Sequence, residues 1–225
     1  MAVQHGIPGE WARVRGTVLS LWPLFLSFIL LGAFAAAALL GRATLLFAGL
    51  FLASLIFMSL SWRRGVRRVA SFFVGARGEE RVAGVLATLP ETYHVFHDFV
   101  ADGRPVDHVV IGPAGVFAIE TKNWRGRVTL DDRLVLLDGH VPDRSPLKQT
   151  LHEGDAVQRE LEKAGWKGSV MPLLCFASDT FDAGHAVVGR VELVNARDLA
   201  GWVKSLPETL APNELERLIQ LVSVH

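Results

Sequence analysis

Asp107, Glu120 and Lys122 have the residue types and the spacing that metal-dependent chemistry requires. Glu120 and Lys122 lie two positions apart in a β-rich run, so their side chains are expected on one face of a strand. Charged groups on such an apolar strand are costly to bury without partners, and Asp107 on the preceding run is the obvious partner. Two carboxylates suit Mg²⁺ or Mn²⁺, hard cations that prefer oxygen ligands. Lys122 beside the ion would orient or deprotonate a water, or stabilise charge on a phosphate oxygen.

Five short motifs follow one another around these residues. They are Gly75-Ala76-Arg77-Gly78-Glu79, Val106-Asp107-His108, Gly115-Val116-Phe117, Glu120-Thr121-Lys122-Asn123 followed by Gly126, and Pro146-Leu147-Lys148-Gln149. In this order they resemble the nuclease-related domain (NERD) family of the PD-(D/E)xK nuclease superfamily. Ser145 departs from the pattern, because the family commonly has Asn before that proline. The resemblance covers about residues 75–177, and residues 178–225 fall outside it.

The resemblance implies a role for each of five residues. Asp107 and Glu120 would ligate the metal ion, and Lys122 would be the catalytic base or the charge stabiliser. Glu79 would be an accessory acid, and Gln149 would orient groups of the site from a later helix. The structural alternative for the first three is a buried ion-pair cluster. For Glu79 it is a carboxylate that compensates a helix dipole, and for Gln149 it is plain helix surface.

The elements that must position these side chains can be read from the spacing of apolar residues. A helix is predicted over residues 75–89, where Pro90 ends it. The predicted strands are 93–99, 106–112, 116–122, a hairpin across Asp131-Asp132, 170–177, and one or two within 186–194. Further helices are predicted over 146–164, 196–205 and 212–222. This order indicates an α/β domain with a mixed central sheet flanked by helices, which the resemblance implies is a restriction-endonuclease-like core.

Two uncharged apolar runs precede this domain: 24 residues in Thr17–Leu40 and 18 in Ala43–Leu60. About 20 apolar residues in a helix cross the hydrocarbon core of a bilayer. The sequence therefore predicts a membrane anchor over residues 1–68, with transmembrane helices at about 17–40 and 43–62, and a separate domain over 69–225. A cleaved signal peptide is the alternative, but it would have a shorter apolar core and no second run.

Arginines flank the two runs unequally. Six lie outside the pair of runs and only Arg42 lies in the turn between them. Because the side richer in Lys and Arg stays in the cytoplasm, both termini and the domain 69–225 are predicted to be cytoplasmic at the cell membrane. The small residues of 32–38 and the pair Gly49 and Ala53 would let the two helices pack closely, or let copies of the chain self-associate.

The favoured function is a membrane-anchored, Mg²⁺-dependent nuclease that hydrolyses phosphodiester bonds of DNA, or of RNA. The alternative is a non-catalytic module that uses the same fold to bind nucleic acid or protein at the membrane. Residues 69–225 hold 16 basic and 22 acidic residues, which favours the alternative because such a domain lacks a broad basic surface. A P-loop, a G-x-S-x-G motif and an H-E-x-x-H motif are all absent from the sequence.

Overall fold

The computed structural model describes residues 1–39 and 44–223. Contacts divide the chain into two compact units. One unit is Trp11–Val74, which consists of helices. The other is an α/β unit that joins Met1–Glu10 to Gly75–His225, so the first ten residues pack with the domain that follows the helices.

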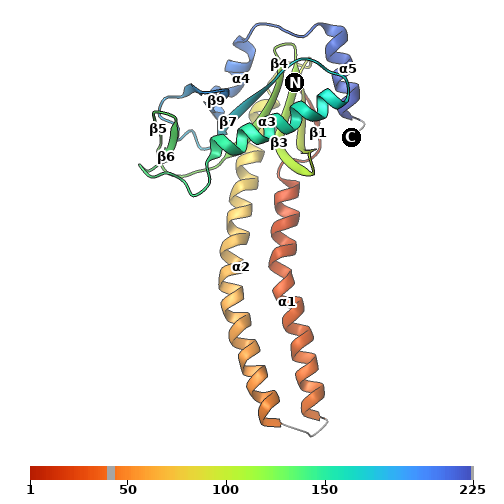
Figure 1. Cartoon of the computed structure of the whole chain (residues 1–225), viewed down its shortest axis with the longest axis vertical. Helices are drawn as coiled ribbons and strands as arrows, with labels where there is room; N and C mark the ends of the chain where they lie inside the picture. The colour runs from red at the N-terminus through yellow and green to blue at the C-terminus, as the bar shows by residue number, and fades with distance from the viewer. Residues whose placement is uncertain (40–43, 224–225) are drawn as a thin grey trace. The chain divides into compact units, whose positions relative to one another are not determined.

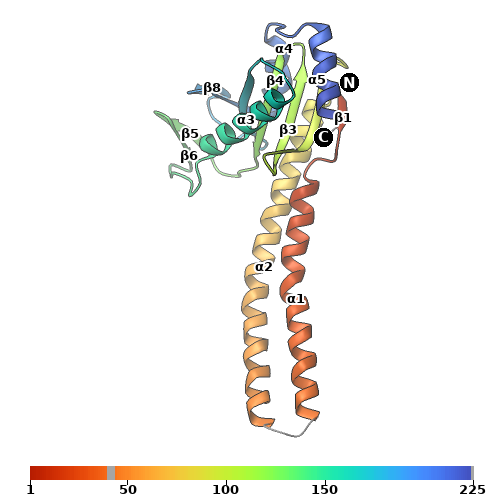
Figure 2. The same cartoon turned by 45° about the vertical axis from the view of Figure 1, so that its right-hand side comes forward.

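The helical unit contains α1 (Glu10–Leu39) and the first part of α2 (Thr44–Leu86). The two helices lie side by side (Figures 1 and 2). Over the part of the chain that the structure describes, no helix is both long and apolar enough to cross a membrane. The predicted transmembrane helices at 17–40 and 43–62, and with them the predicted anchor, therefore gain no support here. The predicted turn at Gly41 and Arg42 lies outside the described residues.

A seven-stranded mixed sheet forms the centre of the α/β unit, in the order β1-β2-β3-β4-β7-β9-β8. Its strands are β1 (Val3–His5), β2 (His94–Ala101), β3 (Arg104–Gly112), β4 (Gly115–Lys122), β7 (Val170–Phe176), β8 (His185–Val188) and β9 (Val191–Asn195). The β2–β3, β3–β4 and β8–β9 pairs are antiparallel, and the other three are parallel. A separate hairpin consists of β5 (Val128–Asp131) and β6 (Leu134–Leu137).

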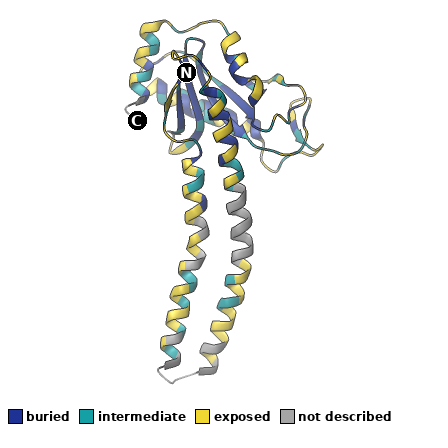
Figure 3. Cartoon of the chain, turned by 180° about the vertical axis from the view of Figure 1, so that it is seen from behind, coloured by how far each residue is buried: buried dark blue, intermediate teal, exposed yellow. Residues whose placement is uncertain are grey.

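Helices cover both faces of the sheet, and the central strands β3, β4, β7 and β9 are mostly buried (Figure 3). The end of α2 and α4 (Ala196–Ser205) pack on the face that carries Phe117 and Ile119. On the other face, α3 (Pro146–Lys163) and α5 (Pro212–Ser223) pack against Val109 and Ala118. Because side chains alternate along a strand, Glu120 and Lys122 share the α3 side with Ala118.

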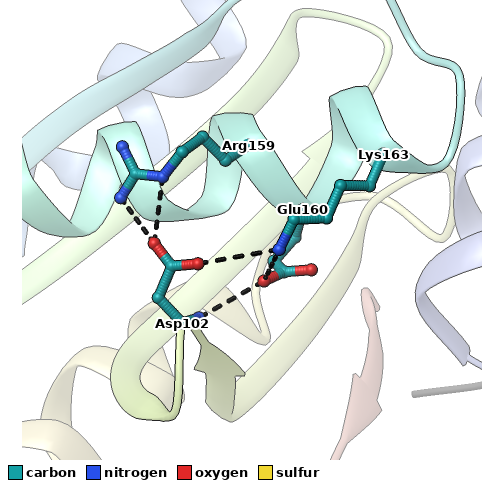
Figure 4. A network of polar contacts seen from close by, with 4 residues as sticks. All are labelled: Asp102, Arg159, Glu160 and Lys163. Carbon is teal, nitrogen blue, oxygen red and sulfur yellow. Dashed lines mark hydrogen bonds and ion pairs between the residues drawn. The ribbon is translucent and has the colours of Figure 1, made fainter.

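Helix α3 is fixed at both ends. Ser145 caps its first turn by accepting a hydrogen bond from the Lys148 N–H, and Pro146 begins the helix, where its missing N–H costs nothing. Near its other end, Arg159 Nε donates to Asp102 in the β2–β3 turn at 3.0 Å, and Lys163 bridges Asp102 and Glu160 (Figure 4). These contacts hold α3 in one register over the sheet.

Gly154 allows α3 to approach β7 closely, because a Cβ there would lie 2.8 Å from Cγ of Pro172. We expect Gly154→Val to destabilise the domain by about 1–3 kcal/mol, the usual cost of overpacking. The matched control is Gly84→Val in α2, where a Cβ would meet no described atom within 4 Å. Chemical denaturation of both variants tests this. Equal free energies of unfolding would show that α3 moves away from the sheet without cost.

The architecture confirms the predicted mixed central sheet flanked by helices, and each predicted strand and helix of residues 93–222 is present within a few residues. Two features differ from the sequence analysis. The helix expected to begin at residue 75 is the last part of α2, which continues without a break from Thr44. The edge strand β1, which pairs in parallel with β2 through Val3↔His94 and His5↔Phe96, was not predicted.

Candidate functional site

The candidate site forms where β3 and β4 run side by side. His108 of β3 pairs with Ile119 of β4, so the preceding residue Asp107 lies beside Glu120. The Asp107 carboxylate accepts a hydrogen bond from the backbone N–H of Thr121 at 2.8 Å. The two carboxylates predicted to be metal ligands are thus on neighbouring strands, and the backbone of β4 fixes one of them.

Lys122 lies between groups from two elements. Its amine forms an ion pair with the Glu120 carboxylate on its own strand, and it donates to Oε1 of Gln149 on α3 at 3.0 Å. The Glu120 side chain is 4% exposed and that of Lys122 is 20% exposed. Gln149 is therefore not plain helix surface, because its amide touches the Lys122 amine.

Glu153 is a member of the site that the sequence analysis missed. Its Oε1 accepts a hydrogen bond from Nε2 of Gln149 at 2.9 Å. Gln149 and Glu153 are four residues apart, which puts their side chains on one face of α3. That spacing was the available signal, but it points to the site only once α3 is known to lie over β4.

Glu79 comes from the end of α2 and is 7% exposed. It lies close enough to Asp107 for its charge to raise the pKa of that carboxyl. The N-terminal segment covers it, because a Cβ on Gly9 would lie 3.3 Å from Oε2 of Glu79. All five predicted site residues are thus in one region of the domain, while their catalytic roles stay predictions.

The site concentrates negative charge. Burial raises the pKa of the Asp107 carboxyl well above its ordinary value, and the charges of Glu120, Glu79 and Glu153 raise it further. Burial and the Glu120 carboxylate raise the pKa of Glu153 to about 9. Burial lowers the pKa of Lys122, but the charge and the hydrogen bond of Glu120, together with the charges of Asp107 and Glu153, outweigh burial, so the net shift is upward and the amine is protonated.

This donor set fits a hard divalent cation. Mg²⁺ is usually held by one or two carboxylates, with waters and substrate phosphates completing its coordination. Asp107 and Glu120 supply such a pair, and the raised pKa of Asp107 reflects negative charge that a cation would offset. Among the described residues, no three His, Cys, Asp or Glu side chains are arranged to hold an ion together.

The sequence neighbours of the site residues face elsewhere. His108 is fully buried on the opposite face of β3 from Asp107, and its Nδ1 lies 2.8 Å from Nδ1 of His97. Trp124 packs on Phe176 with ring centroids 6.0 Å apart. Arg127 forms an ion pair with Asp182. Strand alternation turns the His108 ring to the face of β3 opposite Asp107.

The mixed α/β domain places Asp107 on one strand and the Glu120 and Lys122 pair on the next, which is the arrangement that the motifs indicated. Comparison with known families agrees. Residues 74–177 match the profile of the Nuclease-related domain, NERD, so the chain contains a domain of this kind. The match includes Glu79, Asp107, Glu120, Lys122 and Gln149, and it includes Glu153.

Comparison with individual proteins adds little about function. A stretch of 58 residues is 40% identical to an uncharacterized protein of Bacillus anthracis. This matched stretch covers 23% of this chain and 27% of that protein. The chain thus spans about a quarter of the length of that relative. No solved structure matches the chain.

Proposed function

We propose that the α/β unit is a Mg²⁺-dependent nuclease that hydrolyses phosphodiester bonds of DNA, or of RNA. The observation that carries this proposal is the convergence of Asp107, Glu120 and Lys122 on adjacent strands, inside a domain that matches the nuclease-related family. The surroundings of these three residues also support the proposal, since three further polar side chains lie close to them: Glu79, Gln149 and Glu153.

Each side chain has a task in this reaction. Asp107 and Glu120 would hold the cation, which when bound supplies an activated water and neutralises charge on the phosphate. Lys122 is protonated, so we assign it to stabilising negative charge on a phosphate oxygen rather than to removing a proton. Gln149 holds the Lys122 amine from α3. Burial of Glu120 keeps bulk water away and strengthens these electrostatic interactions.

A cleavage assay tests the proposal. The full-length chain, purified in detergent, is incubated with Mg²⁺ or Mn²⁺ and with single-stranded DNA, double-stranded DNA and RNA. We expect metal-dependent cleavage of at least one DNA form, and chelation of the metal should stop it. Failure to cleave any of these substrates with either metal would reject the nuclease assignment.

The acidic charge of the domain favours a second candidate, a non-catalytic module that binds nucleic acid or protein. With 22 acidic and 16 basic residues over 69–225, the domain has few cations with which to displace counterions from a duplex. A wild-type chain that binds DNA in the presence of Mg²⁺ without cleaving it would support this candidate.

We also propose that the helical unit attaches the chain to a lipid bilayer, with both termini in the cytoplasm. What supports this is the pair of uncharged runs and the exposure of large apolar side chains, among them Phe28 and Ile29 on α1 and Ile56 and Phe57 on α2. Gly32 and Gly49 meet no described atom within 4 Å of an ideal Cβ, which leaves room for a second copy.

Topology is tested with alkaline phosphatase, a reporter that is active only outside the cytoplasm. In a bacterial host, we expect a fusion at Gly41 to be active and a fusion at His225 to be inactive, because arginines concentrate outside the two runs. Activity at His225 would contradict the proposed orientation. Two inactive fusions, together with release of the chain from membranes by alkaline carbonate, would reject the anchor.

A further inference from the structure

We infer that Glu153 is a positioning residue for the proposed nuclease reaction: it sets the orientation of the Gln149 amide and thereby the position of the Lys122 amine. This inference rests on the proposed function. Glu153 lies outside the D…E-x-K motif. The basis of the inference is a continuous series of contacts, from Glu153 to Gln149, from Gln149 to Lys122, and from Lys122 to Glu120.

The chemistry of an amide explains why Gln149 needs a partner. Its side chain has a carbonyl oxygen that only accepts and an NH₂ group that only donates, and the two ends have nearly the same shape. The Lys122 ammonium only donates, so it is held only when Oε1 of Gln149 faces it. A flipped amide would place NH₂ against NH₃⁺ and leave two donors facing each other.

Glu153 selects one of these two orientations. Its Oε1 accepts from Nε2 of Gln149 at 2.9 Å, which leaves Oε1 of Gln149 to accept from Lys122 at 3.0 Å. The hydrogen bond from Lys122 involves a charged group, and such bonds are stronger than neutral ones. Without an acceptor at position 153, only Lys122 selects the orientation of the amide, so Gln149 is held at one end and positions the Lys122 amine less firmly.

The same helix contains a matched control. Gln158 Nε2 donates to Oε1 of Glu162 at 3.0 Å, which is the same Gln–Glu pair at the same spacing. There, however, the Gln158 carbonyl accepts from the backbone N–H of Val170 at 2.7 Å and touches no cation. Replacing Glu162 therefore tests the loss of such a pair from α3 without any effect on Lys122.

The test compares Glu153→Leu, Glu153→Gln and Glu162→Leu in the full-length chain, with kcat, KM and Mg²⁺ affinity measured for each. We expect Glu153→Leu to lower kcat about tenfold, the scale of one lost hydrogen bond to a charged network, with KM and Mg²⁺ affinity within twofold of wild type. Glu153→Gln keeps an acceptor and should recover most of the rate. Glu162→Leu should cleave like the wild type.

A double-mutant comparison separates positioning from a general loss of structure. In a Lys122→Ala background, Glu153→Leu should cause no further loss, because the group that it positions is gone. An additive loss would overturn the inference. So would weakened Mg²⁺ binding in Glu153→Leu, which would make Glu153 a ligand instead.

A second measurement does not depend on cleavage. Acetylation of Lys122 by acetic anhydride, followed by mass spectrometry with Lys148 as internal reference, reports how firmly the amine is held. We expect faster labelling of Lys122 in Glu153→Leu than in Glu162→Leu. If the wild type cleaves nothing, the nuclease proposal fails while this comparison still decides the positioning role, and equal labelling rates would overturn it.

Discussion

Replacing either Asp107 or Glu120 with Ala is expected to abolish Mg²⁺ binding and cleavage together. The two carboxylates are the pair that fits the cation, and removal of one takes away half of the negative charge that would hold it. We expect cleavage to fall by on the order of 10³ or more, since the cation supplies most of the charge neutralisation. Isothermal titration with Mg²⁺ and a cleavage assay on the same preparations measure both effects.

The control for this experiment is Asp131→Ala, which removes an exposed carboxylate from the β5–β6 hairpin and should change neither property.

The thermal stability of an Asp107 variant is also expected to change in a definite direction. Because the folded pKa of Asp107 is raised, its ionisation destabilises the folded state as pH rises above the ordinary carboxyl pKa. Asp107→Asn should therefore melt higher than wild type at pH 7 without Mg²⁺. Retained metal binding in Asp107→Ala would favour the structural ion-pair cluster.

Lys122→Ala is expected to separate binding from turnover. The amine competes with a cation for the Glu120 carboxylate, so its removal should leave Mg²⁺ affinity unchanged or increased. Turnover should fall by on the order of 10² or more, as for other lost groups that stabilise charge in a transition state. Titration of Mg²⁺ followed by single-turnover cleavage at saturating metal measures the two quantities separately.

Lys148→Ala is the matched control, since Lys148 is exposed on the first turn of α3, next to Gln149 in sequence. It removes the same charge without touching Glu120. Cleavage by Lys122→Ala at the wild-type rate would remove Lys122 from the mechanism. An unfolded Lys122→Ala chain would show that the ion pair with Glu120 is chiefly structural, which the conservative Lys122→Met variant would then confirm or refute.

The sequence could locate those residues of the site that are brought together by short-range features of the chain, such as strand alternation and a short turn. Glu120 and Lys122 share a strand face by alternation, and a short turn places Asp107 on the neighbouring strand. Glu153 depends instead on how α3 packs over the sheet, through Gly154 on Pro172 and Asp102 on Arg159. No spacing within residues 146–163 carries that information, so the site could be predicted only in part.

The fold shows the same division. Strands of seven to nine residues, such as β3 and β7, have enough apolar positions to be recognised. The strand β1 has three residues, too few for a period, and its partner β2 lies about ninety residues further along the chain. His108 shows that neighbours in sequence need not share a site: it follows Asp107 directly, but the pleat of the strand separates the two side chains.

The pairing of β1 with β2 has a consequence for the path of the chain. Residues 1–10 and the residues from 75 onward fold into one unit, and a folded unit lies on one side of any bilayer. The chain between residues 10 and 75 must then cross a bilayer an even number of times, zero included, because an odd number would separate β1 from its partner. Reporters fused to the two ends of this chain must therefore report the same compartment, whatever the number of crossings.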